Sequence, residues 1–148
     1  MARSRGAPVT SPLDLVEVRT PHSSELPGVR ALLTANGWAH RLGDDAWIEK
    51  LVASSRAIVA IEAGEVVGFA RGVTDGLSNG YLSMLVVAEA HRRKGIGTRL
   101  VREIIGAERE ITWVLRASRP GAREFFERLG FRSSSDAMER HRASCPDV

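Results

Sequence analysis

The chain has 148 residues, with 21 basic against 18 acidic side chains, so its formal charge is only +3 although its isoelectric point is about 9.7. This length favours one domain, and the 43% hydrophobic content is enough to build its core. No run reaches the roughly 18 to 20 apolar residues of a membrane-spanning helix, and the single cysteine, Cys145, excludes a disulfide framework or a cysteine-based zinc site within one chain.

The N-terminal third predicts one strand and two helices. Residues 13–19 alternate between apolar and polar side chains, as a short strand does. A helix is expected to begin at the cap residue Ser24 and to end before Asn36, because its apolar side chains recur at helical spacing. A second helix is expected to begin near Asp44 and to end before Ser54.

The middle of the chain predicts a meander followed by a helix. The runs Ala57–Ile61 and Val66–Ala70 are separated by a short glycine-containing turn, which is typical of an antiparallel hairpin. The run Gly80–Val87 extends the meander as a third strand. After it the period of the apolar residues changes from two to 3.6, which predicts an amphipathic helix from about Gly95 to Gly106.

Three further elements are predicted near the C-terminus. Ile111–Leu115 has the composition of a buried strand, and residues 121–129 form a helix that ends at Gly130. Residues 131–140 are expected to supply one or two closing strands. The order β-α-α-β-β-β-α-β-α-β predicts an α/β (α+β) fold, with helices on the faces of a mixed sheet.

One segment combines a buried strand end, a basic loop with two glycines and the start of an amphipathic helix. The first amides of a helix have no partner within the helix and lie at the positive end of its dipole, so they suit a phosphate ligand. Gly95 and Gly97 leave the backbone accessible, and Thr98 adds a hydroxyl donor. The cations of this loop are Arg92, Arg93 and Lys94. The alternative is an ordinary strand-to-helix turn with solvated basic side chains.

The loop fits neither a P-loop, which needs Gly-Lys-Ser/Thr, nor a dinucleotide fingerprint, which needs a third glycine. The run Arg92-Arg93-Lys94-Gly95-Ile96-Gly97 instead resembles the pyrophosphate loop Gln/Arg-X-X-Gly-X-Gly/Ala of the GNAT superfamily of acetyl-CoA-dependent N-acetyltransferases. The run Phe125-Phe126-Glu127-Arg128-Leu129-Gly130-Phe131 is similar to a second element of that family, about 30 residues later. The resemblance is good over residues 56–132, and we expect residues 13–140 to form the acetyltransferase domain.

The resemblance implies a single-domain GNAT fold with a mostly antiparallel sheet, about four helices on its faces and a splayed strand pair that holds acetyl-CoA. The two strands of that pair would end near Val87 and begin near Ile111. The backbone amide of Val86 or Val87 would stabilise the oxyanion of the reaction. The residues expected to bind the cofactor are Leu85, Val86, Val87, Arg92, Arg93, Lys94, Gly95, Ile96, Gly97, Thr98 and Phe125.

Two catalytic groups common in the family are absent. Phe126 stands where relatives often have a tyrosine that protonates the leaving thiolate, and a thiol of pKa roughly 8.5 leaves tolerably without one. No carboxylate lies between Tyr81 and Val87 to serve as a base. Tyr81 could hold a water molecule, or it could be strand packing; Asp75 is most simply a turn residue. His40 is a candidate base, against the alternative of a solvated loop histidine.

The leading hypothesis is an enzyme that transfers acetyl from acetyl-CoA directly to a primary amine, on a small molecule or a peptide. The alternative is a catalytically degenerate GNAT-fold module that binds acyl-CoA or has a regulatory role. Nucleic acid is not expected as a partner, because acidic residues are interspersed among the arginines. We expect a cytoplasmic protein with no metal and no membrane partner, and disordered or flexible tails at residues 1–12 and 141–148. The family resemblance leaves a homodimer open, and no segment identifies an interface.

Overall fold

The structure is a computed structural model that describes residues 15–143. The chain divides into two compact units, Met1–Arg116 and Ala117–Val148, and each is considered by itself below. The tail predicted at residues 1–12 lies outside the described residues, as do residues 144–148 of the tail predicted at the other end.

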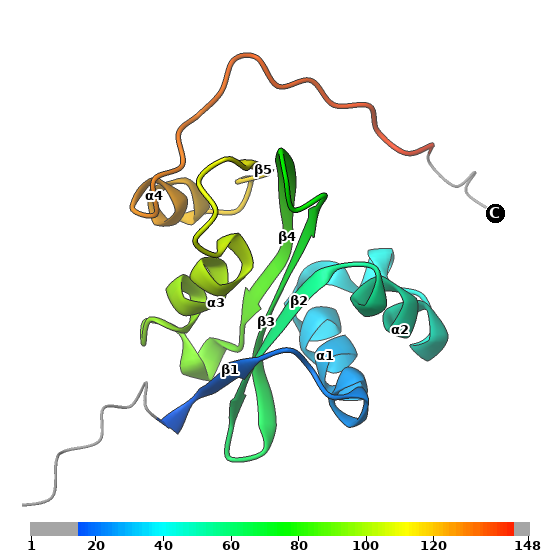
Figure 1. The fold of residues 1–148 in the computed structure, drawn as a ribbon. Coiled ribbons are helices and arrows are strands. Elements are labelled where there is room, and N and C mark those ends of the chain that lie inside the picture. Colours follow the sequence, from blue (N-terminus) through cyan, green and yellow to red (C-terminus); the bar gives the residue numbers. More distant parts are fainter. Residues whose placement is uncertain (1–14, 144–148) are drawn as a thin grey trace, which may run out of the picture. The chain divides into compact units, whose positions relative to one another are not determined.

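A five-stranded mixed sheet forms the centre of the first unit (Figure 1). Its strands lie in sequence order, and each of the first three is antiparallel to the next, whereas β5 runs parallel to β4. The strands are β1 (Glu17–Arg19), β2 (Arg56–Glu62), β3 (Glu65–Thr74), β4 (Asn79–Val87) and β5 (Thr112–Leu115). The predicted α/β class and the meander of three antiparallel strands are confirmed.

The hairpin between β2 and β3 turns at two residues with positive φ, Ala63 (50°) and Gly64 (77°). This pair of dihedral angles is that of the tight turns whose twist matches the twist of the flanking strands. The strands therefore pair almost to the turn, with Glu62 opposite Glu65. The predicted hairpin is confirmed, and both strands are longer than the apolar runs that identified them.

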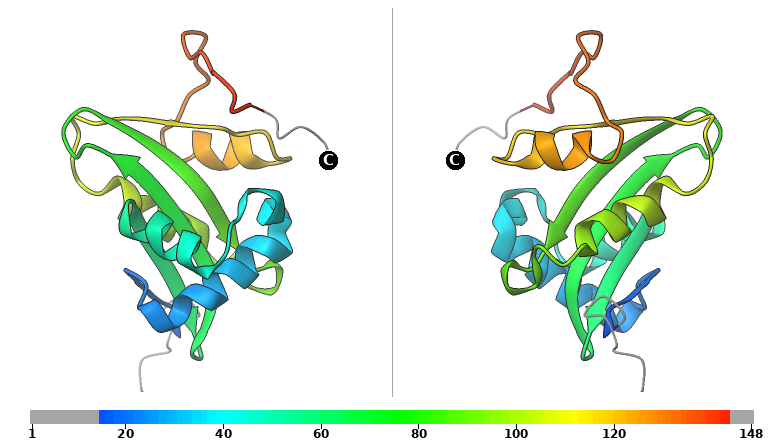
Figure 2. Two further views of the ribbon diagram at one scale, coloured as in Figure 1. Left: turned by 90° about the vertical axis from the view of Figure 1, so that its right-hand side faces the viewer. Right: turned by 90° about the vertical axis from the view of Figure 1, so that its left-hand side faces the viewer.

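Helices cover both faces of this sheet (Figure 2). α1 (Leu26–Leu33) and α2 (Asp45–Ala53) lie on one face, and α3 (Ile96–Ile105) lies on the other. Phe69 of β3 is fully buried in the cluster that includes the apolar side chains of α1. Asp44 caps α2 by accepting a hydrogen bond from the amide of Trp47 at 2.9 Å. The three predicted helices of this unit are confirmed to within a turn.

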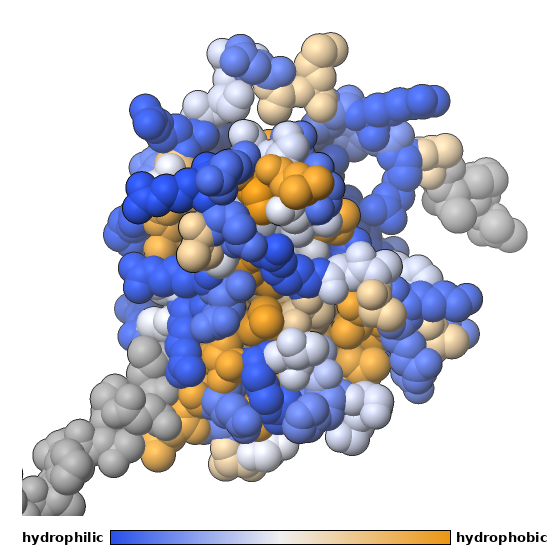
Figure 3. All heavy atoms as spheres, in the orientation of Figure 1, coloured by the Kyte–Doolittle hydropathy of each residue, from blue (hydrophilic) through white to orange (hydrophobic). Residues whose placement is uncertain are grey.

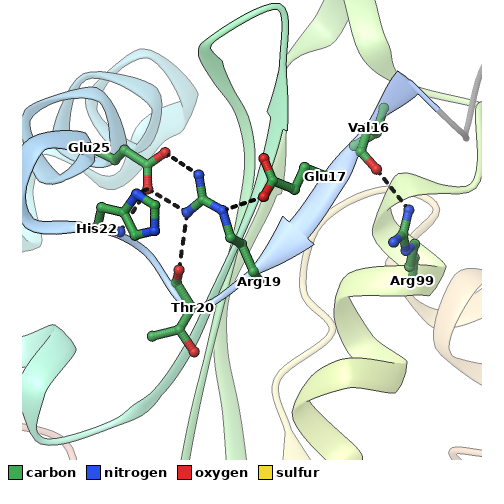
Figure 4. Close-up of polar contacts among 7 residues, drawn as sticks. All are labelled: Val16, Glu17, Arg19, Thr20, His22, Glu25 and Arg99. Carbon is green, nitrogen blue, oxygen red and sulfur yellow. Dashed lines mark hydrogen bonds and ion pairs between the residues drawn. The ribbon is translucent and has the colours of Figure 1, made fainter.

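β1 is joined by polar contacts to elements on both sides of the sheet (Figure 4). The Arg19 guanidinium donates to both carboxylate oxygens of Glu25, at 2.7 and 2.8 Å, and to Glu17 at 2.8 Å. Arg99 of α3 donates to the carbonyl oxygen of Val16 at 2.9 Å. These contacts fix a strand of only three residues, which main-chain pairing alone would hold weakly.

The second unit contains α4 (Ala122–Glu127) and no strand within its described residues, 117–143. The one or two closing strands expected over 131–140 are therefore wrong. This segment contains three consecutive serines, Ser133–Ser135, which have low strand propensity. Its hydrogen bonds are local, since the Asp136 amide donates to Ser134 Oγ at 3.1 Å.

Hydrophilic side chains make up most of the face shown in Figure 3, with smaller hydrophobic areas between them. This surface agrees with the interspersed charges of the sequence. Among the described residues, no helix combines the length and the apolar character needed to cross a membrane.

Candidate active site

The glycine-containing loop connects β4 to α3 as the sequence predicted. A short 3-10 turn, Glu89–His91, follows β4, and α3 begins at Ile96 directly after Gly95. Gly95 has φ +84°, and a Cβ at this position would have no atom within 4 Å. The first hydrogen bond into the helix is donated by Arg99 to the Gly95 carbonyl, at 3.1 Å. Within the described chain, none of the amides of residues 93–98 donates to a backbone carbonyl.

The three cations of the loop differ in their surroundings. The Arg92 guanidinium donates to the Val87 carbonyl at 2.9 Å and to Asn36 Oδ1 at 2.8 Å, so it joins the loop to the end of β4 and to the segment after α1. Arg93 and Lys94 are exposed, and neither forms an ion pair with a carboxylate of the described residues. Arg93 also has positive φ, 64°, which places two left-handed residues within the loop.

A close polar contact between two half-buried side chains joins the same loop to the β2–β3 hairpin. His91 Nδ1 lies 2.5 Å from Glu62 Oε2, and both atoms are inaccessible to solvent. Glu62 is the last residue of β2. The loop is therefore attached at two points, by His91 to β2 and by Arg92 to β4, while its glycine and its two exposed cations remain accessible.

β4 contains a bulge at the point where it separates from β5. The two strands pair from Asn79 opposite Thr112 to Leu82 opposite Leu115, where β5 ends and β4 continues for five residues. Just beyond, Met84 has φ +55°, and the register against β3 shifts by one residue. Met84 is also buried in the core. A methionine in this conformation is strained, and nothing in its residue type would have predicted the bulge.

The residues expected to line the cofactor strand lie directly after this bulge. Val86 is buried opposite Phe69, while Leu85 and Val87 are half-buried. In α3, Ile96 is buried, so it can offer only its amide to a ligand, and Gly97 and Thr98 are half-buried. The first unit thus brings together all of the expected cofactor residues except Phe125.

Phe125 and Phe126 belong to the second unit. Their rings meet edge to face, with centroids 5.0 Å apart, and Phe126 meets Phe131 in the same way at 5.6 Å. The Phe131 amide donates to the Phe126 carbonyl at 3.1 Å, so the chain folds back over the end of α4. Phe126 is buried and has no acidic proton, whereas Phe125 is half-buried.

The candidate bases occupy different environments. Tyr81 is 36% exposed on β4, opposite Val73 of β3. Asp75 accepts hydrogen bonds from the amides of Leu77, Ser78 and Asn79, which lower its pKa, so it is a turn residue and a weaker base than an ordinary aspartate. His40 is exposed in the loop before α2. Among the described residues, no group of three or more His, Cys, Asp or Glu side chains is arranged to hold a metal ion.

Sequence reasoning missed Arg71, a half-buried cation on β3. Its Nε donates to Ser55 Oγ at 2.8 Å, and burial lowers the pKa of its guanidinium below the ordinary value. An arginine within an apolar strand is a signal of a functional cation, but Arg71 stands one residue beyond the predicted strand Val66–Ala70. The longer strand found in the structure is what places it on the sheet.

Residues 53–133 match the family model described as "Acetyltransferase (GNAT) domain". The uncharacterized N-acetyltransferase YafP of Escherichia coli is 33% identical over 110 residues, which are 74% of this chain and 64% of that protein, so the chain spans less than two thirds of that relative's length. Among solved structures, an acetyltransferase of the GNAT family from Xanthomonas campestris aligns at TM-score 0.73 with 24% identity, over 86% of this chain and 93% of that one.

A GNAT-family acetyltransferase from Streptococcus pneumoniae aligns at TM-score 0.70 with 25% identity, over 87% of this chain and 96% of that one. The structural matches agree on the fold, and the family model covers β2 to β5 and both segments from which the sequence resemblance was drawn, the loop before α3 and the segment 125–131. This chain belongs to the GNAT superfamily of acetyltransferases.

Proposed function

We propose that this protein transfers an acetyl group from acetyl-CoA to a primary amine. The observation that carries the proposal is the start of α3, where six consecutive residues, 93–98, offer amides without a backbone acceptor in the described chain. The open space at Gly95 lets a polyanion approach these amides closely. Arg93 and Lys94 supply exposed positive charge beside them. This chemistry suits the pyrophosphate of CoA.

The pantetheine arm would then run along β4, on the side that β5 leaves after Leu82. The backbone of Leu85–Val87 would pair with the amide groups of the arm, and the Val86 or Val87 amide would stabilise the developing oxyanion. The bulge at Met84 supports this assignment, because it changes the direction of β4 just where the thioester would lie. Residues 13–140 would form the acetyltransferase domain.

The reaction would proceed by direct attack. The amine nitrogen forms a bond to the thioester carbonyl carbon, the carbon–sulfur bond breaks, and CoA leaves as a thiolate. The proton lost by the amine passes to a water molecule that Tyr81 would hold; the partial exposure of its ring on β4, next to the point where β4 and β5 diverge, supports this role. The thiolate takes its proton from solvent, since Phe126 has none to give.

The test is thiol release from acetyl-CoA by the purified protein, over a panel of primary amines with a no-amine control. We expect free CoA and acetylated amine in equal amounts, with a rate that depends on the amine. Calorimetric titration of CoA is measured in parallel. Tight CoA binding with no acetylated product from any amine would contradict catalysis and favour a degenerate binding module. No CoA binding at all would contradict the cofactor site itself.

A further inference from the structure

The guanidinium of Arg71 is fixed by a hydrogen bond from its Nε. Its Nε donates to Ser55 Oγ at 2.8 Å, and the Ser55 hydroxyl in turn donates to the Leu51 carbonyl at 2.6 Å. A guanidinium fixed through Nε keeps its two terminal nitrogens free, and these form the fork that binds a carboxylate with two parallel hydrogen bonds.

No carboxylate of the described residues forms an ion pair with Arg71. The ionisable group that influences it is the Tyr81 phenol on the neighbouring strand, and no carboxylate does so. Burial without an acidic partner lowers the pKa of this guanidinium, because the charged form loses hydration that nothing replaces. Placing a cation in this way costs stability, and an anionic ligand would recover it.

Arg71 lies at the point where β4 and β5 begin to diverge. Its register partner on β4 is Ser83, the residue after Leu82, which is the last to pair with β5. Beside it, three neighbouring strands present one exposed apolar side chain each, at adjacent register positions: Val73 (42% exposed), Tyr81 (36%) and Val114 (45%). We call these three residues the apolar row.

The apolar row and Arg71 share the face of the sheet that carries α1 and α2. Val73 is two residues from Arg71 along β3 and therefore points to the same side. The opposite side of this region is filled by Trp113, whose ring lies against Gly72 and Gly80 and beside α3. A molecule on the apolar row would thus lie next to the guanidinium fork and beside the opening between β4 and β5.

We propose that Arg71 binds a carboxylate on the acetyl acceptor, and that the acceptor is a small amine carrying both a carboxylate and an apolar side chain that lies on the apolar row. This inference rests on the proposed acetyl transfer. It assigns the acceptor to the amino-acid class of amines. Charge complementarity excludes cationic polyamines as favoured acceptors, because a second positive charge would lie beside the unpaired guanidinium.

The experiment compares phenylalanine, leucine and β-alanine, each beside its own carboxamide, as acceptors for the full-length protein. The carboxamide keeps the shape and removes the negative charge. The two amines of a pair differ in basicity, so their rates are not compared directly. For each protein we take kcat/KM for the acid divided by kcat/KM for the amide. The quotient is this ratio in the wild type divided by the same ratio in Arg71→Gln. Intrinsic reactivity cancels in this quotient. Arg102→Gln, an exposed arginine of α3, is the matched control.

We expect the quotient to be about 10- to 100-fold for phenylalanine and leucine, because two charge-assisted hydrogen bonds are lost. Arg71→Lys should retain part of the preference, and Arg102→Gln should give a quotient near one. CoA titration of Arg71→Gln verifies that this variant is folded. Equal ratios in the wild type and in folded Arg71→Gln would overturn the inference and leave acetyl transfer standing. No turnover of any acid or amide by a wild type that acetylates other amines of the panel would also overturn the inference, whereas no turnover of any amine would overturn acetyl transfer as well.

Discussion

Gly95 gives the loop the backbone conformation on which access to the first amides of α3 depends. Its φ of +84° is costly for any residue with a side chain, and the space around it is open. We predict that Gly95→Val lowers the affinity for CoA at least 10-fold, because the branched side chain occupies the space through which a phosphate would approach. Isothermal calorimetry with CoA measures the effect, and circular dichroism verifies the fold.

Gly64 provides the matched control for Gly95. It has a similar φ, +77°, and open surroundings, but it lies in the turn between β2 and β3. Gly64→Val should impose a comparable backbone strain, of about 1 kcal/mol, and leave CoA affinity within about twofold of the wild type. Equal losses of affinity in the two variants would contradict a phosphate site at Gly95 and indicate a general effect of strain.

Glu25 makes the stability of the N-terminal segment depend on pH. Its hydrogen bonds from Arg19, aided by one from the His22 amide, lower its pKa from 4.5 to about 2. A carboxylate with a depressed folded-state pKa contributes stability that is fully present above the unfolded pKa of 4.5 and is lost as the pH falls towards 2. We predict that Glu25→Gln lowers the midpoint of thermal unfolding at pH 7, and that its difference from the wild type shrinks below pH 4.5.

Thermal unfolding of Glu17→Gln is the comparison for this variant, because Glu17 also accepts from Arg19 but is 63% exposed. An exposed pair contributes little, so its midpoint should stay close to that of the wild type at every pH. A difference between Glu25→Gln and the wild type that stays constant from pH 7 to pH 2.5 would show that the ionised carboxylate is not the source of the stability.

The packing between β4 and β5 depends on the absence of a side chain at Gly80. A Cβ on Gly80 would lie 2.5 Å from the ring of Trp113, its register partner on β5. Because the closely packed Trp113 ring has little room to move away, Gly80→Ala should lower the free energy of unfolding by about 1–3 kcal/mol. Urea unfolding measures it. In a Trp113→Leu background the same change should cost less, and an equal cost in both backgrounds would show that the ring is not the obstacle.

Local patterns predicted the elements that local interactions determine. The β2–β3 hairpin follows from a glycine turn between two apolar runs, and α3 follows from apolar side chains at helical spacing. The segment 131–140 contains apolar residues but has no strand, because a strand needs a partner and the serines favour local hydrogen bonds. Strand pairing is a long-range property that a single segment does not encode.

In the candidate site, too, the features set by local sequence could be predicted and those set by long-range contacts could not. The position of the loop and the open approach to its backbone at Gly95 could be predicted, because a residue without a Cβ leaves the backbone accessible. The different contacts of the adjacent cations could not be predicted. Arg92 contacts Asn36, which is 56 residues away in sequence, whereas Arg93 does not. The bulge at Met84 and the partial burial of Arg71 likewise depend on contacts between segments that are distant in sequence.

At the scale of the whole molecule, the proposed CoA site joins segments that are separate in sequence. It combines the end of β4, the loop before α3, and β5, which diverges from β4 after four pairs. A ligand held by all three should stabilise the folded chain by about 2.7 kcal/mol at a concentration 100 times its dissociation constant. We predict a corresponding rise in the midpoint of thermal unfolding on addition of CoA.

Hydrogen exchange locates the source of this rise. CoA should slow the exchange of amides in residues 83–87 and 93–98, because it occupies the unpaired side of β4 and accepts from the free donors before α3. The hairpin turn at residues 62–65 serves as the internal reference, because its central residues, Ala63 and Gly64, form a tight turn that lies outside the proposed contacts. Protection that is uniform along the chain, with no excess in the two named segments, would place CoA binding elsewhere and remove the basis for the acetyl-transfer site.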